Sequence, residues 1–221
     1  MKALVIFSGG QDSTTCLGWA LNRFEEVECI CFSYGQTHSI EVEQAQKICN
    51  TMNVKLKLIR IDFLNELVVS ALTSGKDVNQ KHELNKELPA SWVPNRNALF
   101  LVLAHSYAQK IGADKLIIGV SQADYSGYPD CREEFIDSME KTLNSASNTD
   151  IEIISPLMFR NKAQTFRLAE EENILDLVIN ESHTCYNGDR KHNHAWGYGC
   201  DNCPACKLRK KGYQEFIGME D

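Results

Sequence analysis

Short, continuous apolar runs alternate with longer segments of helical period along most of the chain. Residues 2–7 form such a run and predict a buried strand, whereas residues 12–24, with apolar side chains at helical spacing, predict a helix. The same criteria predict further strands at residues 27–34, 55–61, 116–120 and 151–154. They predict further helices at residues 40–52, 94–111, 133–143 and 162–173. Apolar strands that alternate with helices favour parallel strands with helices on both faces. We therefore expect an α/β fold with a doubly wound, mostly parallel five-stranded sheet.

Two segments depart from this pattern. Residues 65–89 are polar and have no clear period, so we expect a long excursion with room for a short helix, of the kind that often forms a lid or a binding loop. From about Glu181 the composition changes to Cys, His, Gly and Asn, and this tail is too small for a hydrophobic core of its own. We expect a nucleotide-binding α/β domain at residues 1–180 and a metal-binding module at residues 181–221 that packs on it.

Composition and charge narrow the classes of function. The 221 residues, 43% of them hydrophobic and 24% charged, suit one large globular domain with a small appendage. The net charge of −7 disfavours broad contact with nucleic-acid phosphates, which requires clustered Lys and Arg. No apolar stretch approaches the roughly 20 residues that a membrane-spanning helix needs, and residues 1–10 lack the features of a signal peptide. We therefore expect a cytoplasmic protein that binds neither membranes nor nucleic acids directly.

A glycine-containing loop joins the first strand to the first helix, where residues 8–13 read Ser-Gly-Gly-Gln-Asp-Ser. In a doubly wound sheet, ligands bind at the carboxyl ends of the strands. Two glycines allow a sharp turn, and the start of the helix offers free N–H groups and a positive dipole end. These features indicate an oxyanion site, most naturally for a chain of phosphates. A plain turn capped by Asp or Ser remains an alternative, and the loop is neither a Walker A motif nor a dinucleotide fingerprint.

Four of the nine cysteines gather near the C-terminus with the spacing C-x14-C-x2-C-x2-C: Cys185, Cys200, Cys203 and Cys206. Two-residue gaps let thiolates converge on one metal, and four thiolates suit tetrahedral zinc in a closed structural site. An iron–sulfur cluster and a redox pair remain alternatives. The nearby histidines could replace a cysteine, but we expect them at the surface or next to the ligands: His183, His192 and His194. Pro204, with glycines nearby, predicts a non-helical knuckle.

The glycine loop is similar to the PP-loop of the adenine-nucleotide α-hydrolase family, which holds the pyrophosphate of ATP and supports cleavage between the α and β phosphates. Further segments narrow the resemblance: V-P-N-R-N (93–97), D-Y-S-G-Y-P-D-C-R (124–132), S-P-L-M (155–158) with N-K-A (161–163), and T-C-Y-N-G (184–188). With the cysteines, and in this order, they resemble the 7-cyano-7-deazaguanine synthase family from residue 2 to about residue 212. The stretch between Cys185 and Cys200 is longer than expected for that family, which leaves open whether a local histidine competes for the metal.

The resemblance implies ATP, Mg²⁺ and Zn²⁺ as cofactors and assigns roles to individual residues. The ATP-binding residues would be Phe7, Ser8, Gly9, Gly10, Gln11, Asp12, Ser13, Thr14 and Thr15. The catalytic residues would be Lys162, Arg96 and Asp12, and Asp12 would also help to hold Mg²⁺. The substrate-binding residues would be Arg96, Asp124, Tyr125, Tyr128, Asp130 and Arg132. A carboxylate can accept hydrogen bonds from the N–H groups of a deazapurine, and a Tyr ring can stack on the base. A polar turn remains the alternative for residues 124–132. The four cysteines would hold zinc.

The activity implied by the resemblance is the ATP-dependent conversion of 7-carboxy-7-deazaguanine and ammonia to 7-cyano-7-deazaguanine, through adenylate and amide intermediates, in queuosine biosynthesis. A homodimer is implied as well. Two alternatives remain: another PP-loop enzyme that forms amides or modifies tRNA, and a nucleotide-sensing binding module with a zinc knuckle. The net charge of −7 disfavours an enzyme that acts on tRNA.

Overall fold

The computed structural model describes residues 1–34, 40–74, 77–123 and 128–218. The strands are β1 (Lys2–Ile6), β2 (Glu26–Ser33), β3 (Lys55–Arg60), β4 (Lys115–Ile118), β5 (Glu152–Ile154), β6 (Asn193–His194) and β7 (Gly197–Tyr198). The helices are α1 (Gln11–Leu21), α2 (Ile40–Thr51), α3 (Leu64–Leu67), α4 (Ala71–Ser74), α5 (Arg96–Ile111), α6 (Glu133–Ser147), α7 (Lys162–Glu171), α8 (Leu175–Glu181) and α9 (Pro204–Ile217), with a 3₁₀ turn, η1, at Pro129–Cys131. Each strand and helix predicted before residue 174 is present, with ends that differ by a few residues.

Five strands form one parallel sheet in the order β3-β2-β1-β4-β5, which confirms the predicted fold class. Strands β2 and β3 lie on one side of β1, and β4 and β5, which come later in the chain, lie on its other side. The strand order therefore reverses between β1 and β4. Ligands of doubly wound sheets bind beside such a reversal, at the carboxyl ends of the strands. The loop that follows β1 therefore lies where a ligand is expected.

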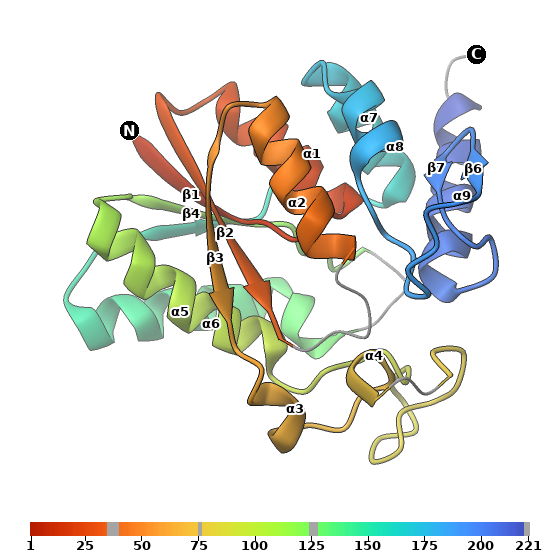
Figure 1. The fold of residues 1–221 in the computed structure, drawn as a ribbon. Coiled ribbons are helices and arrows are strands. Elements are labelled where there is room, and N and C mark those ends of the chain that lie inside the picture. Colours follow the sequence, from red (N-terminus) through yellow and green to blue (C-terminus); the bar gives the residue numbers. More distant parts are fainter. Residues whose placement is uncertain (35–39, 75–76, 124–127, 219–221) are drawn as a thin grey trace.

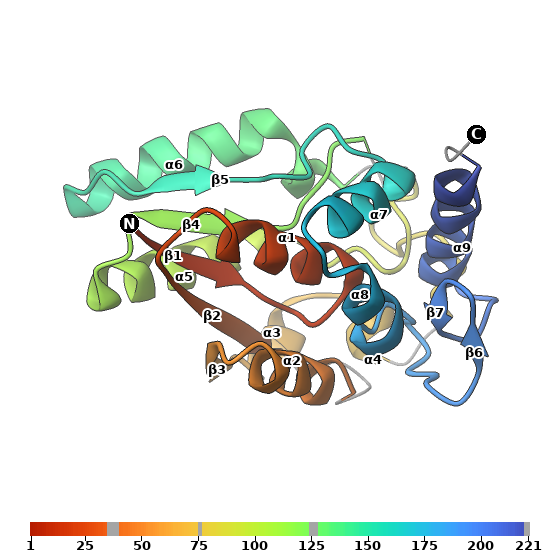
Figure 2. The same ribbon diagram turned by 90° about the horizontal axis from the view of Figure 1, so that it is seen from above.

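Helices cover both faces of the sheet (Figure 1; Figure 2). On one face, Leu4 and Ile6 of β1 are buried with side chains of α5 and α6. On the other face, Ala3 and Val5 are buried with side chains of α1 and α2. Because neighbouring residues of a strand point to opposite faces, a sheet covered on both sides requires the continuous apolar run that the sequence contains. No helix in the described residues combines the length and apolar character that crossing a membrane requires.

The excursion between β3 and α5 contains the two short helices α3 and α4. His82 stabilises this excursion. Its side chain is buried, and its Nε2 donates to the carbonyl of Val69 (2.6 Å). The His82 Nδ1 accepts from the backbone N–H of Leu84 (3.3 Å). Val78 and Ala90 share a buried cluster with the cysteines of the tail. The excursion is therefore anchored against the C-terminal part of the chain.

The C-terminal tail differs from the sequence prediction. The prediction of a non-helical knuckle is wrong, because Cys203 is the N-cap of helix α9 and Cys206 lies in its first turn. Proline is favourable in the first turn of a helix, where its missing N–H would have no intrahelical acceptor, and Pro204 occupies that place. Phe216 of α9 is buried against Phe166 of α7, so the tail packs on the rest of the chain. The domain boundary predicted at residue 181 falls at the end of α8 and stays a prediction.

Candidate active site

The loop after β1 turns sharply at Gly9. Its φ of +77° lies in the left-handed region, and a Cβ at this position would lie 2.7 Å from the backbone N of Ala45 in α2. Two serines close the turn: the N–H of Ser8 donates to the hydroxyl of Ser13 (3.2 Å), and the N–H of Gly10 donates to the hydroxyl of Ser8 (3.3 Å). Helix α1 then begins without a side-chain cap. The N–H of Gln11 donates to the hydroxyl of Thr184 (3.4 Å), and the N–H groups that follow it in the first turn have no intrahelical acceptor and suit an anion.

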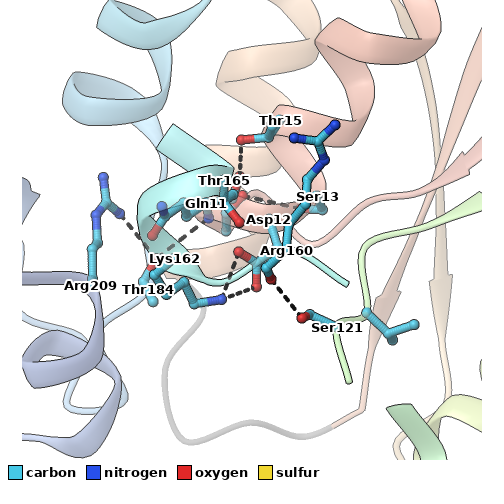
Figure 3. Close-up of polar contacts among 12 residues, drawn as sticks. Gln11, Asp12, Ser13, Thr15, Ser121, Arg160, Lys162, Thr165, Thr184 and Arg209 are labelled. Atoms are coloured by element: carbon cyan, nitrogen blue, oxygen red, sulfur yellow. Dashed lines mark hydrogen bonds and ion pairs between the residues drawn. The ribbon is translucent and has the colours of Figure 1, made fainter. Parts of the chain in front are cut away.

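An ion pair lies beside this loop. The Nζ of Lys162 donates to both carboxylate oxygens of Asp12, at 2.8 and 2.6 Å (Figure 3). Lys162 is the first residue of α7, whose start is fixed by a reciprocal capping box between Asn161 and Gln164, with both bonds at 2.9 Å. The side chain of Lys162 is 8% exposed and that of Asp12 is 30% exposed, so the carboxylate is the more open member. The fold thus brings together two residues, both predicted to be catalytic, that are 150 positions apart.

Arg96, the remaining residue predicted to be catalytic, begins α5 and lines the same cavity. Its Nη1 donates to the hydroxyl of Tyr34 (3.5 Å), and its guanidinium lies 6.0 Å from the ring centroid of Phe100. Its Nε is buried and has no hydrogen-bond partner in the described part of the chain. Burial opposes the charge of Arg96, but Tyr34 and Asp130 outweigh it, and the pKa of Arg96 is raised. Arg96 is therefore a permanent cation with a donor left for an anionic ligand.

The loop, the ion pair and Arg96 border one cavity of about 270 Å³ at the carboxyl ends of β1, β2 and β4. The residues predicted to bind or react that line this cavity are Phe7, Ser8, Gly10, Gln11, Asp12, Ser13, Arg96, Tyr128 and Lys162. Three predicted ATP-binding residues lie behind it. Gly9 packs on α2, and the hydroxyl of Thr14 is buried with no partner among the residues described. The hydroxyl of Thr15 donates to the backbone carbonyl of Gln11 within α1 (3.0 Å).

Tyr128 is the predicted substrate-binding tyrosine that lines the cavity. Its hydroxyl is hydrogen-bonded to that of Ser91 (2.7 Å) and to the side chain of Tyr186. These contacts hold the Tyr128 ring at the cavity wall. Two other residues predicted to bind the substrate, Asp124 and Tyr125, lie outside the described residues.

Asp130 and Arg132 lie outside the lining of the cavity. The carboxylate of Asp130 accepts from the backbone N–H of Asn97 (3.2 Å), and its backbone carbonyl accepts from the Asn97 side chain (3.0 Å). This contact holds the first turn of α5, where the helix N–H groups have no intrahelical acceptors. The side chain of Arg132 is 52% exposed and pairs with Glu134 (3.7 Å). In this arrangement Asp130 fixes the position of α5, and Arg132 points to solvent.

Several cavity residues carry no role in the sequence analysis: Tyr34, Glu41, Ser121, His183, Thr184 and Tyr186. Burial raises the pKa of Tyr34 and of Tyr186, so both hydroxyls are neutral at physiological pH. Two signals could have pointed to some of them. Tyr34 directly follows β2, at the carboxyl edge where ligands bind, and the T-C-Y-N-G string begins at Thr184. Glu41, on helix α2, carries no such signal.

The four C-terminal cysteines converge on one point. Their Sγ atoms all lie within 4.8 Å of one another, and those of Cys200 and Cys206 are 4.0 Å apart. Zinc with four thiolates at about 2.3 Å requires Sγ separations of about 3.8 Å, so the cluster fits a tetrahedral zinc ion. Hydrogen bonds from Cys203 and Cys206 lower the pKa of the Cys185 thiol. The cluster thus already favours one thiolate, the form in which cysteine binds metals.

The histidines of the tail have other partners. His183 and His194 each donate an Nε2–H to a backbone carbonyl, at 3.1 and 2.9 Å. The Nδ1 of His192 lies 2.6 Å from a carboxylate oxygen of Asp189. The group of candidate metal ligands found in the described residues contains the four cysteines and none of these histidines. Burial also lowers the pKa of His183, so its ring is neutral.

Comparison with known proteins assigns this geometry to a family. The family model described as "Queuosine biosynthesis protein QueC" matches residues 2–217. A curated relative from Wolinella succinogenes, named 7-cyano-7-deazaguanine synthase, is 57% identical over 216 residues, which cover 97% of this chain and 93% of the relative. A relative of the same name from Clostridium botulinum is 46% identical over 215 residues, covering 97% of this chain and 95% of the relative.

A solved structure agrees on the fold. A 4-thiouridine synthetase in complex with RNA and bound ATP aligns with 99% of this chain and 51% of its own chain, with a TM-score of 0.53 and 20% identity. At that identity the likeness shows a shared fold and nothing more. The family model and the curated relatives, in contrast, span nearly the whole chain, including the loop, the ion pair and the four cysteines. The chain therefore belongs to the QueC family of queuosine biosynthesis proteins, a family of ligases.

Proposed function

We propose that the protein converts 7-carboxy-7-deazaguanine and ammonia to 7-cyano-7-deazaguanine with the use of ATP. The observation that carries this proposal is the ion pair of Asp12 and Lys162 beside the uncapped start of α1. The ion pair supplies a carboxylate and a cation, and the start of α1 supplies backbone N–H groups at the same cavity. These are the groups that a Mg²⁺-bound triphosphate needs. Family membership supports the choice of substrate.

ATP is proposed to lie with its phosphates over the first turn of α1. Backbone N–H groups of the loop would hold the pyrophosphate portion, and Lys162 would stabilise the charge that develops on it as it leaves. Asp12 would hold Mg²⁺, directly or through water, and the ion would supply neutralisation of phosphate charge. The contact between Lys162 and Asp12 supports this assignment, because it keeps the cation and the carboxylate side by side at the cavity.

The proposed reaction activates the same carbon twice. A carboxylate oxygen attacks the α-phosphorus of ATP, and pyrophosphate leaves. Ammonia then adds to the carbon of the adenylate, AMP departs with the oxygen, and loss of one proton gives the amide. The amide oxygen attacks a second ATP in the same way. When AMP departs again, the nitrogen loses its two remaining protons and the nitrile forms. Both oxygens of the original carboxylate leave in AMP.

Arg96 is proposed to hold the substrate carboxylate. Its unused Nε donor and permanent charge suit a carboxylate, since guanidinium groups bind such anions through paired N–H donors. The rings of Tyr34 and Tyr128 line the same cavity and offer faces on which the deazapurine could stack. The other residues predicted to bind the substrate stay predictions.

The cysteine cluster is proposed to hold zinc in a structural role. Four thiolates complete a tetrahedral shell and leave no position for a reactive water. A homodimer in the cytoplasm, without direct contact to nucleic acid, completes the proposal. The family resemblance supports the dimer, and the net charge of −7 supports the choice of a small-molecule substrate over tRNA.

The test is a turnover assay. Zinc-loaded protein is mixed with ATP, Mg²⁺, ammonium and 7-carboxy-7-deazaguanine, and the products are followed by mass spectrometry. The expected result is the nitrile, with two AMP and two pyrophosphate formed for each nitrile. AMP without nitrile would refute the substrate, and tight ATP binding without cleavage would favour the nucleotide-sensing module. Heavy oxygen in the substrate carboxylate should appear in AMP, which checks the proposed path of both oxygens.

A further inference from the structure

Arg209 of α9 is a fully buried cation with many hydrogen bonds. Its Nε donates to the carbonyl of Trp196 (2.8 Å), and its Nη2 donates to the carbonyl of Val178 (2.8 Å). Its Nη1 donates to the hydroxyls of Ser182 and Thr184, both at 3.0 Å. Burial lowers the pKa of Arg209 to about 10, so it remains charged at neutral pH. A buried charge persists only when its donors are satisfied, and these contacts satisfy them.

One of these acceptors contacts the loop at residues 8–13, which is called the ATP loop below. The hydroxyl oxygen of Thr184 also accepts from the backbone N–H of Gln11, the first residue of α1 (3.4 Å) (Figure 3). The neighbouring residue, His183, donates its backbone N–H to the carbonyl of Gly9 (2.9 Å). The segment that precedes Cys185 therefore contacts the loop at two points. Arg209 fixes the same segment through its hydrogen bonds to Ser182 and Thr184.

Helix α9 also lies directly against the catalytic lysine. A Cβ at Gly212 would lie 2.9 Å from the backbone carbon of Lys162, closer than side chains tolerate. Only a glycine at this place lets α9 approach the first turn of α7 so closely. Because Cys203 caps α9 and Cys206 lies in its first turn, the position of this helix is tied to the cysteine cluster. One helix thus contacts the metal site, the lysine and, through Thr184, the loop.

We propose that Arg209 is a positioning residue for the ATP loop, which it orients through the hydroxyl of Thr184. The inference rests on the proposed function, in which this loop holds the phosphates of ATP. By donating to Thr184, the guanidinium fixes the oxygen that anchors the N–H of Gln11, and so it sets where the first turn of α1 presents its donors. Among the four acceptors of Arg209 described above, Thr184 is the one that lines the cavity.

The variant that separates positioning from stability is Thr184→Val. It keeps the shape of the side chain and leaves the other acceptors of Arg209 in place, but it removes the oxygen that connects Arg209 to Gln11. We expect the Kd for ATP to rise about tenfold, as for the loss of a charge-assisted hydrogen bond, with unchanged zinc content. The melting temperature should fall by only a few degrees, because one buried N–H of Arg209 loses an acceptor. Thr184→Ser keeps the oxygen and should restore the Kd to near the wild-type value. Lys211→Ala, on the exposed side of α9, is the matched control and should bind ATP as the wild type does.

A double-mutant cycle tests whether Arg209 acts through Thr184. Arg209→Lys keeps the charge but loses the fork of donors, and it should raise the Kd for ATP in the wild-type background. In the Thr184→Val background the same change should have little further effect, since the connection is already broken. Additive effects would overturn the proposal, as would wild-type ATP binding by Thr184→Val or a loss of zinc and folding in that variant.

Isothermal titration with ATP and Mg²⁺ gives the readout without turnover, which keeps the two proposals distinguishable. If the wild type binds ATP but forms no nitrile, the proposed function fails and the variants still decide the role of Arg209. If the zinc-loaded wild type binds no ATP, both proposals fail together.

Discussion

The two members of the Asp12–Lys162 pair should contribute unequally to stability. Asp12→Asn removes a carboxylate that binds the ammonium of Lys162, which is 8% exposed. Lys162→Met leaves the carboxylate of Asp12, which is 30% exposed, at the edge of the cavity where water can solvate it. Removing one partner of a fully buried pair costs about 3–5 kcal/mol, because the other charge is left in a medium that solvates it poorly. The larger loss should therefore follow from the change at the more exposed residue.

The magnitudes follow from these exposures. For Asp12→Asn we expect a loss of about 3 kcal/mol, the lower end of that range, because the pair borders a cavity that admits water. For Lys162→Met we expect about 1 kcal/mol, since methionine replaces much of the lysine stem and the remaining charge is partly hydrated. With an m-value of about 2 kcal/mol/M, the urea midpoints should fall by about 1.5 M and about 0.5 M.

Urea denaturation of the zinc-loaded protein, followed by circular dichroism, measures both losses. The double variant Asp12→Asn/Lys162→Met is the control, because it removes both charges and should lose less than the sum of the two single changes. Equal losses for the single variants, or a larger loss for Lys162→Met, would refute the reasoning that the buried ammonium is the costly member. Both single variants should bind ATP more weakly, whichever is less stable.

Three further outcomes are expected. Gly9→Ala places a side chain at a φ of +77° against Ala45, so it should cost more than about 1 kcal/mol and weaken ATP binding in calorimetry; unchanged binding would contradict it. Cys206→Ser should reduce zinc below one ion per chain by mass spectrometry and lower the melting temperature by more than about 5 °C; full zinc content would count against the site. Burial opposes ionisation of Glu28, but its two lysine partners outweigh it and lower its pKa below the ordinary 4.5. Its contribution is therefore present above pH 4.5 and is lost as the pH falls, so Glu28→Gln should flatten the decline of the urea midpoint under acid; an unchanged slope would exclude this role.

The sheet could be predicted because burial on two faces leaves a simple trace in the sequence. The apolar run at residues 2–7 corresponds to β1, which helices cover on both sides. The same argument located the loop that follows it, since the carboxyl end of a central strand is a local feature of the chain. The four cysteines were predictable for a similar reason. Their short spacings record a geometry that a metal imposes, and the structure places the thiols together.

The cavity was harder to predict because its walls come from separate elements. Tyr34 follows β2, Glu41 lies on α2, and Thr184 precedes the first cysteine. None of these residues has a spacing to the others that would mark it as part of one site. The contact of Asp130 with a substrate stays a prediction, and the structure shows a second demand on this residue. A polar residue in a recognised string also serves the start of a helix, and here its carboxylate binds the backbone N–H of Asn97.

Helix α9 illustrates what spacing alone cannot convey. Gly212 costs the interior of a helix about 1 kcal/mol relative to alanine, and in the sequence it only weakens the case for a helix. In the structure its missing Cβ is what allows α9 to approach Lys162, and Gly197, with a φ of +113°, leaves the space that the guanidinium of Arg209 fills. Both glycines are therefore required by a partner on another element of the chain. A residue that is unfavourable for its own element becomes informative only when the neighbour it accommodates is known, and here that neighbour is, in each case, a cation that faces the ATP loop or supports it.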